Sequence, residues 1–252
     1  MTVFIETDLE GISGVSAAEM VASSDRYALE RLMADTNAAV RGAFDGGADR
    51  VFVLDGHGGG RNFIPGSLDP RAAQTGIDRV KESDLCFLVG MHAMAGTQNA
   101  FLDHTQSSVA WHRYRINGRL YGELGQLAAY AGAYGIPVGM VSGDLAACAE
   151  ARGMLGNIET AVVKWADGRN RAVCMPDEEA ETLIRGAACR AVRRAGEFRP
   201  LAVTVPAVVE VEFNRCDYAD DAVGRNPALE RIDGFTVRKL IGEIREYTDM
   251  LV

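Results

Sequence analysis

The stretch FIETDLEGISG (residues 4–14) starts as an apolar β-strand and ends in a turn that contains two glycines. Its strand runs into a loop that carries Asp8 and Glu10 two positions apart. A similar pattern recurs in RVFVLDGHGGG (50–60) and DLCFLVGMHA (84–93), where an apolar strand again breaks at a glycine. Strands that are apolar over almost their whole length are typical of a parallel sheet covered on both faces.

Helical patterns separate these strands. The stretch from about Tyr27 to Phe44 has apolar residues at helical spacing, and Ser23 or Ser24 is expected to cap its start. The small-residue stretch GELGQLAAYAGAY (122–134) predicts another helix, and IPVGMVSGD (136–144) predicts a further strand. We therefore predict an α/β fold with a mostly parallel sheet flanked by helices.

The second half of the chain predicts a smaller α+β portion. We expect a strand pair at 161–175, a helix at 177–198, a strand at 202–213 and a last helix at about 235–250. Pro206 lies within the third of these segments, which favours an edge strand or a bulge. The predicted division is a metal-binding α/β core at 1–155 and a C-terminal subdomain at 156–252, with a soft boundary.

The composition excludes several classes of protein. The 252 residues are 48% hydrophobic and 24% charged, as in globular proteins, and the net charge of −9 argues against nucleic acid or an anionic membrane as the main partner. There is no apolar run of about 18 residues, and the opening MTVFIETDLE does not resemble a secretory signal. None of the five cysteines forms a CxxC pair, which favours free thiols and a cytoplasmic location.

Chemically active side chains follow the ends of the predicted strands. His57 follows VFVLDG, His92 follows CFLVGM, and Asp8 and Glu10 follow the first strand. In an open parallel sheet, residues beyond the carboxyl ends of the strands converge on one crevice. Glu123, in LYGELG at the start of a predicted helix, is a plausible fifth member of this group.

The charges of this group favour bound metal. Three carboxylates and two neutral imidazoles would carry −3 in a partly dry crevice, at a cost of several kcal/mol per ion. Two Zn²⁺ ions and a bridging hydroxide would bring the total to neutral, and carboxylate with imidazole is a ligand mix that suits zinc. Two divalent ions roughly 3.5–4 Å apart are a hydrolase arrangement. Taken singly, each motif is also compatible with a solvated turn or a hydrogen-bonded rim residue.

The remaining motifs carry less information. His104, in FLDHTQ, has no strand-end signal, and His112, in AWHRYR, fits a basic and aromatic surface strand. The segment GHGGGR (56–61) lacks both the GxGxxG and the GxxxxGK[ST] spacing of phosphate-binding loops. Its HGGG also occurs in esterase oxyanion loops, but the chain contains no GxSxG nucleophile motif.

The ordered set of motifs resembles the bacterial D-aminopeptidases, a family of dizinc peptidases that assemble into self-compartmentalising rings. The matching motifs are D-x-E-G-I-S-G (8–14), D-x-H (55–57), G-x-H-A (90–93), a following histidine (His104) and N-x-x-x-x-G-E-L-G (117–125). The similarity continues through PVGMVSGD and covers nearly the whole chain. The segment at 65–84 departs from it, because it is shorter than in the relatives and lacks their glycine-rich, methionine-bearing insert.

The resemblance implies roles for individual residues. It implies two Zn²⁺ per subunit, with Co²⁺ or Mn²⁺ as substitutes, and ligands corresponding to Asp8, Glu10, His57, His92 and Glu123. His104 corresponds to the histidine that has a catalytic role in that family, as a proton-transfer group or as a stabiliser of the oxyanion. The implied activity is removal of the N-terminal residue, possibly D-configured, from short peptides or amino-acid amides by a homo-oligomer, a ring-shaped decamer.

Two other functions are compatible with the sequence. One is a metal-dependent amidohydrolase acting on a non-peptide or N-substituted amide, and the other is a non-catalytic metal- or peptide-binding protein. In an aminopeptidase the free amino group of the substrate could ligate one metal or meet an acidic side chain. The sequence does not assign that acid, and Asp144 is only one candidate.

Overall fold

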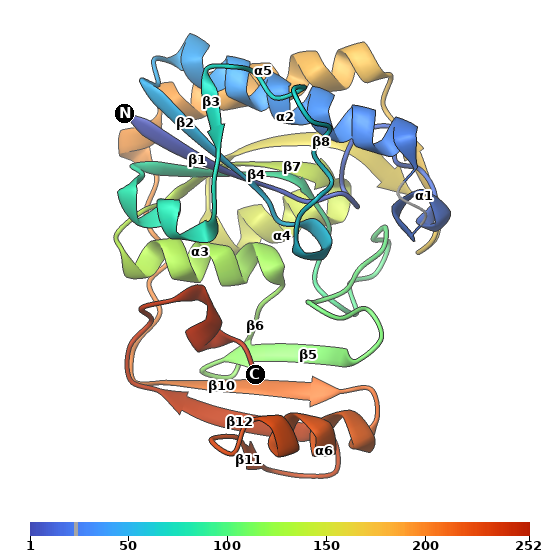
Figure 1. The fold of residues 1–252 in the computed structure, drawn as a ribbon, viewed down its shortest axis with the longest axis vertical. Coiled ribbons are helices and arrows are strands. Elements are labelled where there is room, and N and C mark those ends of the chain that lie inside the picture. Colours follow the sequence, from blue (N-terminus) through green and yellow to red (C-terminus); the bar gives the residue numbers. More distant parts are fainter. Residues whose placement is uncertain (23–24) are drawn as a thin grey trace.

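The computed structural model describes residues 1–22 and 25–252, and a seven-stranded main sheet forms its centre (Figure 1). The strand order is β3-β2-β1-β4-β7-β8-β9, and every neighbouring pair is parallel except β8 and β9. The strands are β1 Thr2–Thr7, β2 Arg50–Asp55, β3 Ala72–Gln74, β4 Leu85–Met91, β7 Val138–Asp144, β8 Glu159–Ala166 and β9 Ala172–Cys174.

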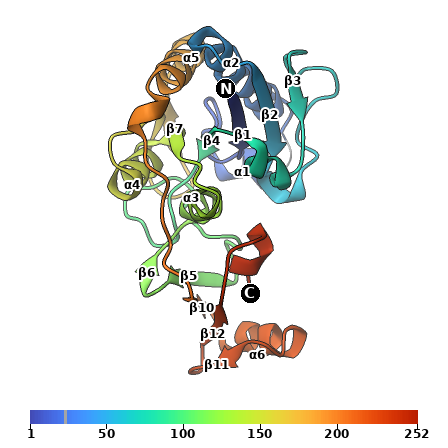
Figure 2. The same cartoon turned by 90° about the vertical axis from the view of Figure 1, so that its left-hand side faces the viewer.

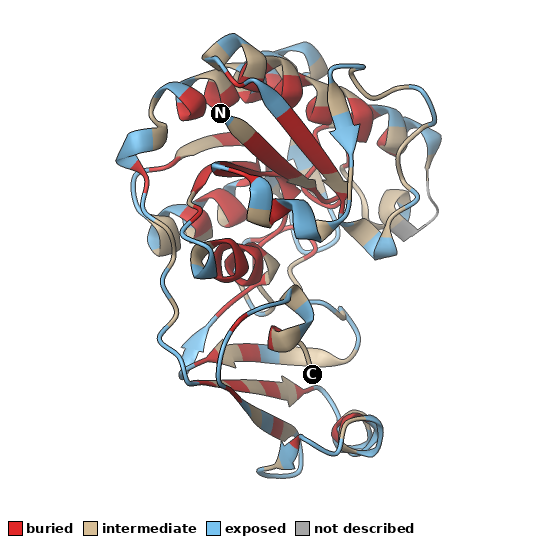
Figure 3. Ribbon diagram, turned by 60° about the vertical axis from the view of Figure 1, so that its left-hand side comes forward, coloured by how far each residue is buried: buried red, intermediate tan, exposed pale blue. Residues whose placement is uncertain are grey.

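Helices cover both faces of the main sheet, as the continuous apolar strands predict. On one face α2 (Arg26–Gly46) packs against α5 (Asp177–Arg193), and on the other lie α3 (Glu123–Ala133) and α4 (Leu145–Leu155) (Figures 1 and 2). Every residue of the central strands β4 and β7 is buried, and Figure 3 shows the buried residues concentrated in this layer. The predicted α/β fold is therefore confirmed.

Local signals place the boundaries of α2. The side chain of Asp25 accepts hydrogen bonds from the backbone N–H groups of Tyr27 and Ala28, so that Asp25 is the N-cap. Ser23 and Ser24, the caps expected from the sequence, lie outside the described residues. The helix ends at Gly47, which adopts the left-handed conformation with φ 106°.

A smaller antiparallel sheet lies beyond α3. Its strand order is β11-β12-β10-β5-β6, and α6 (Cys216–Arg225) packs beside it. A 3₁₀ turn, η4 (Tyr247–Met250), lies between this sheet and α3 (Figure 1). The strands are β5 Trp111–Ile116, β6 Arg119–Leu120, β10 Ala207–Phe213, β11 Glu230–Arg231 and β12 Thr236–Ile241.

Two expectations for the C-terminal region are wrong. The helix expected at about 235–250 is instead strand β12 followed by η4, because Thr236 to Ile241 pair along β10. The β10 strand is not at an edge, since it pairs with β12 on one side and β5 on the other. Its register with β5 does shift between Glu212 and Phe213, at the opposite end of the strand from Pro206. Pro206 precedes its first residue and so removes no hydrogen bond from either ladder.

The two sheets draw on both halves of the chain. Strands β5 and β6 of the smaller sheet come from before residue 155, and β8 and β9 of the main sheet come from after it. The predicted division of the chain into 1–155 and 156–252 stays a prediction.

The remaining elements are short. They are the helix α1 (Ala18–Ala22) and the 3₁₀ turns η1 (His57–Gly59), η2 (Ile77–Glu82) and η3 (Ala195–Glu197). Within residues 1–22 and 25–252, no helix combines the length and the apolar character that crossing a lipid bilayer requires.

Candidate metal centre

Two glycines bring the ends of β1 and β4 into direct backbone contact. A Cβ atom on Gly11 would lie 2.1 Å from the carbonyl oxygen of Met91, and one on Gly90 would lie 2.2 Å from that of Asp8. The backbone N–H of Asp8 donates to the carbonyl of Val89 (2.8 Å), and that of Gly11 donates to the carbonyl of Gly90 (2.7 Å). The loops after these two strands are therefore tied together, and their acids lie beside His92.

The five side chains expected to bind metal lie close together. His92 Nε2 is 3.3 Å from Asp8 Oδ2 and 3.4 Å from Glu123 Oε1, and His57 Nε2 is 3.5 Å from Glu10 Oε1. They come from the loops after β1, β2 and β4 and from the first residue of α3. The convergence expected at the carboxyl edge of the parallel sheet is thus present in the structure.

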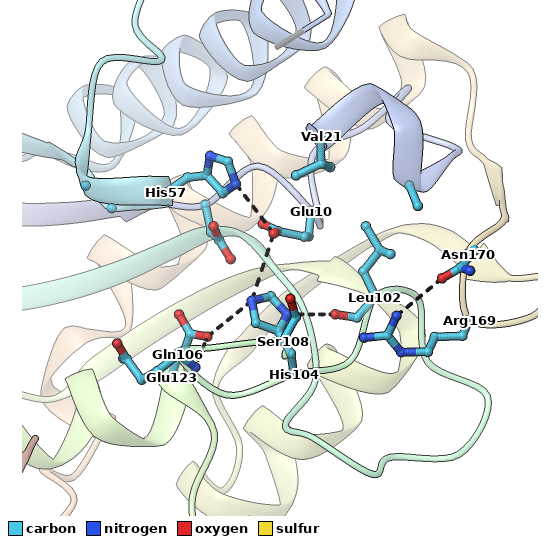
Figure 4. A pocket seen from close by; sticks show the side chains of 15 residues that line it. Glu10, Val21, His57, Leu102, His104, Gln106, Ser108, Glu123, Arg169 and Asn170 are labelled. Atoms are coloured by element: carbon cyan, nitrogen blue, oxygen red, sulfur yellow. Dashed lines mark hydrogen bonds and ion pairs between the residues drawn. The ribbon is translucent and has the colours of Figure 1, made fainter. Parts of the chain in front are cut away.

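His104 lies against the same group of side chains. Its ring stacks on that of His92, and its Nε2 is 3.6 Å from Glu123 Oε1 and 4.0 Å from Glu10 Oε1. Figure 4 shows His57 and His104 approaching Glu10 from two sides. The geometry gives His104 access to the cluster as a ligand too, so that its separate catalytic role stays a prediction.

Backbone carbonyls fix the orientation of two of the imidazole rings. Nδ1 of His92 lies 3.0 Å from the carbonyl oxygen of Ala93, and Nδ1 of His104 lies 2.8 Å from that of Leu102. A carbonyl only accepts, so each Nδ1 carries the proton and donates it. In the neutral ring this leaves the lone pair on Nε2, which faces the carboxylates.

Asn62 supports His57 and was missed by the sequence reasoning. Its side-chain Oδ1 is 3.4 Å from His57 Nδ1, and its Nδ2 donates to Asp55 Oδ1 (2.8 Å) and to the carbonyl of His57 (2.7 Å). The backbone N–H of Asn62 also donates to Asp55 Oδ2 (2.6 Å). The aspartate of the D-x-H motif therefore positions the histidine through Asn62.

Three buried polar atoms in the cluster have no hydrogen-bond partner within the described part of the chain. They are Asp8 Oδ2, Glu10 Oε2 and His92 Nε2, in residues only 7%, 6% and 3% exposed. Leaving such atoms unpaired is costly, and a cation bound between them would remove the cost. Ligand atoms of these three residues lie within 4.8 Å of one another, as do those of His92, His104 and Glu123. The donor set therefore fits zinc.

The pKa values show how strongly the cluster attracts positive charge. Burial and the charge of Glu10 hold the pKa of Asp8 well above its usual value. Burial works to raise the pKa of Glu10 as well, but hydrogen bonding to His57 and the charges of His92 and His57 outweigh it and lower the pKa. For His92 burial favours a lower pKa, yet Glu123 and the other carboxylates raise it well above the ordinary value. Protons or metal ions must therefore neutralise this site.

A cavity of about 660 Å³ opens above the cluster. Asp8, Glu10, His57, His104 and Glu123 line its acidic end. The sequence reasoning gave no role to several other residues that line it, namely Gln106 and Ser108 in the loop after His104 and Arg169 and Asn170 in the β8–β9 turn. This turn reaches the cavity because the N–H of Leu102 donates to the carbonyl of Arg169 (2.8 Å).

Comparison with known proteins shows which family the chain belongs to. A family model described as D-aminopeptidase matches residues 1–252. The chain belongs to the D-aminopeptidase family. It is 31% identical over 227 residues to the D-aminopeptidase of Bacillus subtilis (strain 168), an alignment that covers 84% of this chain and 81% of the relative.

A solved structure agrees with the family. The Zn-dependent D-aminopeptidase DppA from Bacillus subtilis, described as a self-compartmentalizing protease, has a TM-score of 0.93 and 28% identity, covering 100% of this chain and 96% of that one. The expectations of a D-aminopeptidase relative, of an α/β fold and of a metal-dependent aminopeptidase that uses zinc are confirmed. The description of DppA agrees with the expected homo-oligomer. The roles of the individual site residues stay predictions.

Asp144 and His112, two further residues of this D-aminopeptidase family member that the sequence analysis named, lie outside the cluster. Asp144, the candidate for binding the substrate amino group, caps α4 by accepting from the N–H of Ala147 (2.8 Å) and also accepts from that of Phe101 (2.9 Å). It is 1% exposed and does not line the described cavity, so it stabilises the fold instead. His112 lies on β5 in the smaller sheet, as expected for a surface strand.

Proposed function

We propose that this protein is a zinc-dependent aminopeptidase that removes a D-configured N-terminal residue from short peptides or amino-acid amides. Family membership supports the reaction class. The observation that carries the proposal is that Asp8, Glu10 and His92 bring ligand atoms within 4.8 Å of one another beside an open cavity. Asp8 Oδ2, Glu10 Oε2 and His92 Nε2 are also buried and have no hydrogen-bond partner in the described chain.

The proposed ligands of two zinc ions are the carboxylates of three residues and the imidazoles of two, namely Asp8, Glu10, Glu123, His57 and His92. When bound, zinc polarises a carbonyl oxygen and lowers the pKa of water towards neutrality. Around it the chain supplies fixed imidazoles, since Asn62 and the carbonyl of Ala93 set the ring orientations of His57 and His92. Fixed ligands keep the site in one geometry throughout the reaction.

His104 is the proposed proton-transfer group. Its Nδ1–H is held by the carbonyl of Leu102, and burial lowers its pKa. The ring is therefore neutral near pH 7, with its Nε2 free to take a proton from the attacking water. The same nitrogen can then pass that proton to the leaving amine as the peptide bond breaks.

The acidic end of the cavity suits a substrate with a free amino group. Asp8, Glu10 and Glu123 line this end and are proposed to hold the zinc ions, to which a free amine can bind through its lone pair but an acetylated nitrogen cannot. We further propose a closed ring as the assembly, a decamer by family resemblance. The expected cytoplasmic location stays a prediction.

The proposal is tested with D- and L-aminoacyl amides and dipeptides, each paired with its N-acetylated form, before and after chelation. We expect turnover of the free D-amines, loss on chelation and recovery with Zn²⁺, Co²⁺ or Mn²⁺. Full activity after exhaustive chelation would remove the metal mechanism. Equal turnover of the blocked forms would indicate an amidohydrolase instead, and stoichiometric zinc without any turnover would indicate a binding protein.

A further inference from the structure

Gln106 adopts an unusual backbone conformation beside the metal centre. It has φ +59°, in the left-handed region that side chains other than glycine adopt only at a cost in free energy. In this conformation its backbone N–H donates to Glu123 Oε1 over 2.7 Å. That oxygen is the same atom that lies 3.4 Å from His92 Nε2 and 3.6 Å from His104 Nε2.

Two side chains from other parts of the chain hold Gln106 in place. Its side-chain Nε2 donates to Gln126 Oε1 (2.8 Å) and to the hydroxyl oxygen of Tyr247 (3.2 Å), while the Tyr247 hydroxyl donates to Gln126 Oε1 (3.2 Å). Gln126 lies on α3, three residues after Glu123, and Tyr247 belongs to η4 near the C-terminus. The three residues join a cavity loop, a helix and the C-terminal turn.

Gln126 is an unusual residue for its position. It is 0% exposed, and within residues 1–22 and 25–252 its Nε2 has no hydrogen-bond partner. Ala129 and Tyr130, three and four residues further along the same face of α3, are buried, so that an apolar side chain would suit the packing. A buried amide that leaves half of its hydrogen-bonding capacity unused is costly. Its Oε1 accepts hydrogen bonds from Gln106 Nε2 and from the Tyr247 hydroxyl, contacts that an apolar residue could not make.

We propose that Gln126 and Tyr247 are positioning residues of the metal centre. They fix Gln106 so that its N–H holds the Glu123 carboxylate facing His92 and His104. The inference rests on the proposed function, in which Glu123 binds metal. Groups that orient metal ligands from behind typically change metal affinity by about 10–100-fold when they are removed.

The test compares Gln126→Met and Tyr247→Phe with the control Tyr114→Phe in the full chain. The control removes the hydrogen bond from the Tyr114 hydroxyl to the carbonyl of Met250 (2.8 Å), so that it also loosens η4 but does not touch Gln106. Zinc affinity is measured by competition with a chelator, the visible absorption spectrum is recorded with Co²⁺ in place of zinc, and the melting temperature reports folding.

We expect about tenfold weaker zinc binding and a changed Co²⁺ spectrum in Gln126→Met and Tyr247→Phe, with neither change in Tyr114→Phe. Wild-type affinity and spectrum in both variants would overturn the inference while leaving the proposed function intact. If Gln126→Met does not fold, Tyr247→Phe decides the matter alone, since it removes a single hydroxyl group. A wild-type protein that binds no zinc would overturn the proposed function, and this inference with it.

Discussion

The imidazole rings of His92 and His104 stack with their centroids 3.9 Å apart and their planes at 12°. The side chain of His92 is 1% exposed and approaches Asp8, whereas that of His104 is 14% exposed and lines the cavity. Two rings with the same Nδ1 hydrogen bond to a carbonyl thus differ in their access to a substrate. This difference supports a division between a ligand and a proton-transfer group.

His104→Ala tests that division of roles. We expect the variant to keep its zinc but lose activity by about 10²–10⁴-fold, the usual contribution of a positioned acid or base. Asp8→Ala is the matched comparison, and it should lose zinc because it removes a buried ligand. Activity assays together with metal analysis of the purified proteins check both. Stoichiometric loss of zinc from His104→Ala would make His104 a ligand instead.

Zinc affinity should rise with pH. The carboxylates around His92 raise its pKa, so that the metal-free protein keeps a proton there at a pH where a free imidazole has lost it. Zinc must displace this proton, and its affinity therefore falls about tenfold per pH unit below the raised pKa for each proton displaced. The stability of the metal-free protein depends on pH in the opposite direction. Protonated His92 stabilises the fold at low pH, and this stabilisation is lost as pH rises through the raised pKa.

Chelator competition between pH 6 and pH 8.5 measures this effect. The variant His112→Ala is the control, since His112 lies on β5 and should leave the slope unchanged. A zinc affinity that does not change over this range would contradict the prediction.

Gly11→Ala should disrupt both folding and metal binding. Its Cβ would lie 2.1 Å from the carbonyl oxygen of Met91, so the loops after β1 and β4 would have to separate. We expect destabilisation of about 1–3 kcal/mol and loss of zinc. Gly153→Ala in α4 meets no atom within 4 Å and should instead stabilise the protein by about 0.5–1 kcal/mol. Thermal unfolding and zinc content distinguish the two variants. Equal stability and zinc content in both would refute the close approach between Gly11 and Met91.

Lys164 gives a prediction about stability at alkaline pH. Its side chain is 0% exposed, and its Nζ donates to the carbonyls of Glu10 (2.8 Å) and Val15 (2.5 Å). Burial lowers the pKa of Lys164 to about 8 from 10.5. Between these values the unfolded chain binds more protons than the folded one, so the free energy of unfolding rises with pH.

Lys164→Met removes this dependence. From pH 7.5 to pH 10, the stability of metal-free wild type relative to Lys164→Met should increase by about 2 kcal/mol. Urea unfolding at the two pH values measures the difference. If the stability of wild type relative to Lys164→Met instead decreases with increasing pH, burial does not lower the pKa of Lys164.

The wrong prediction for residues 235–250 and the missed roles of Asn62, Gln106 and Lys164 have one origin, namely contacts between distant segments of the chain. Residues 235–250 contain a local pattern compatible with a helix, but Thr236 to Ile241 form a strand because they pair with β10. Asn62, Gln106 and Lys164 carry no motif of their own. Lys164, for example, acts on a carbonyl 154 positions away along the chain.

The sequence by itself determined the α/β fold and which side chains gather at the carboxyl edge of its main sheet. Apolar strands that break at glycine need burial on both faces, and parallel strands place all their carboxyl ends, with Asp8, Glu10, His57 and His92, at one edge. Only the tertiary structure decided which groups orient those side chains. A local pattern encodes burial and backbone conformation, whereas a hydrogen bond between distant segments depends on how the completed layers pack.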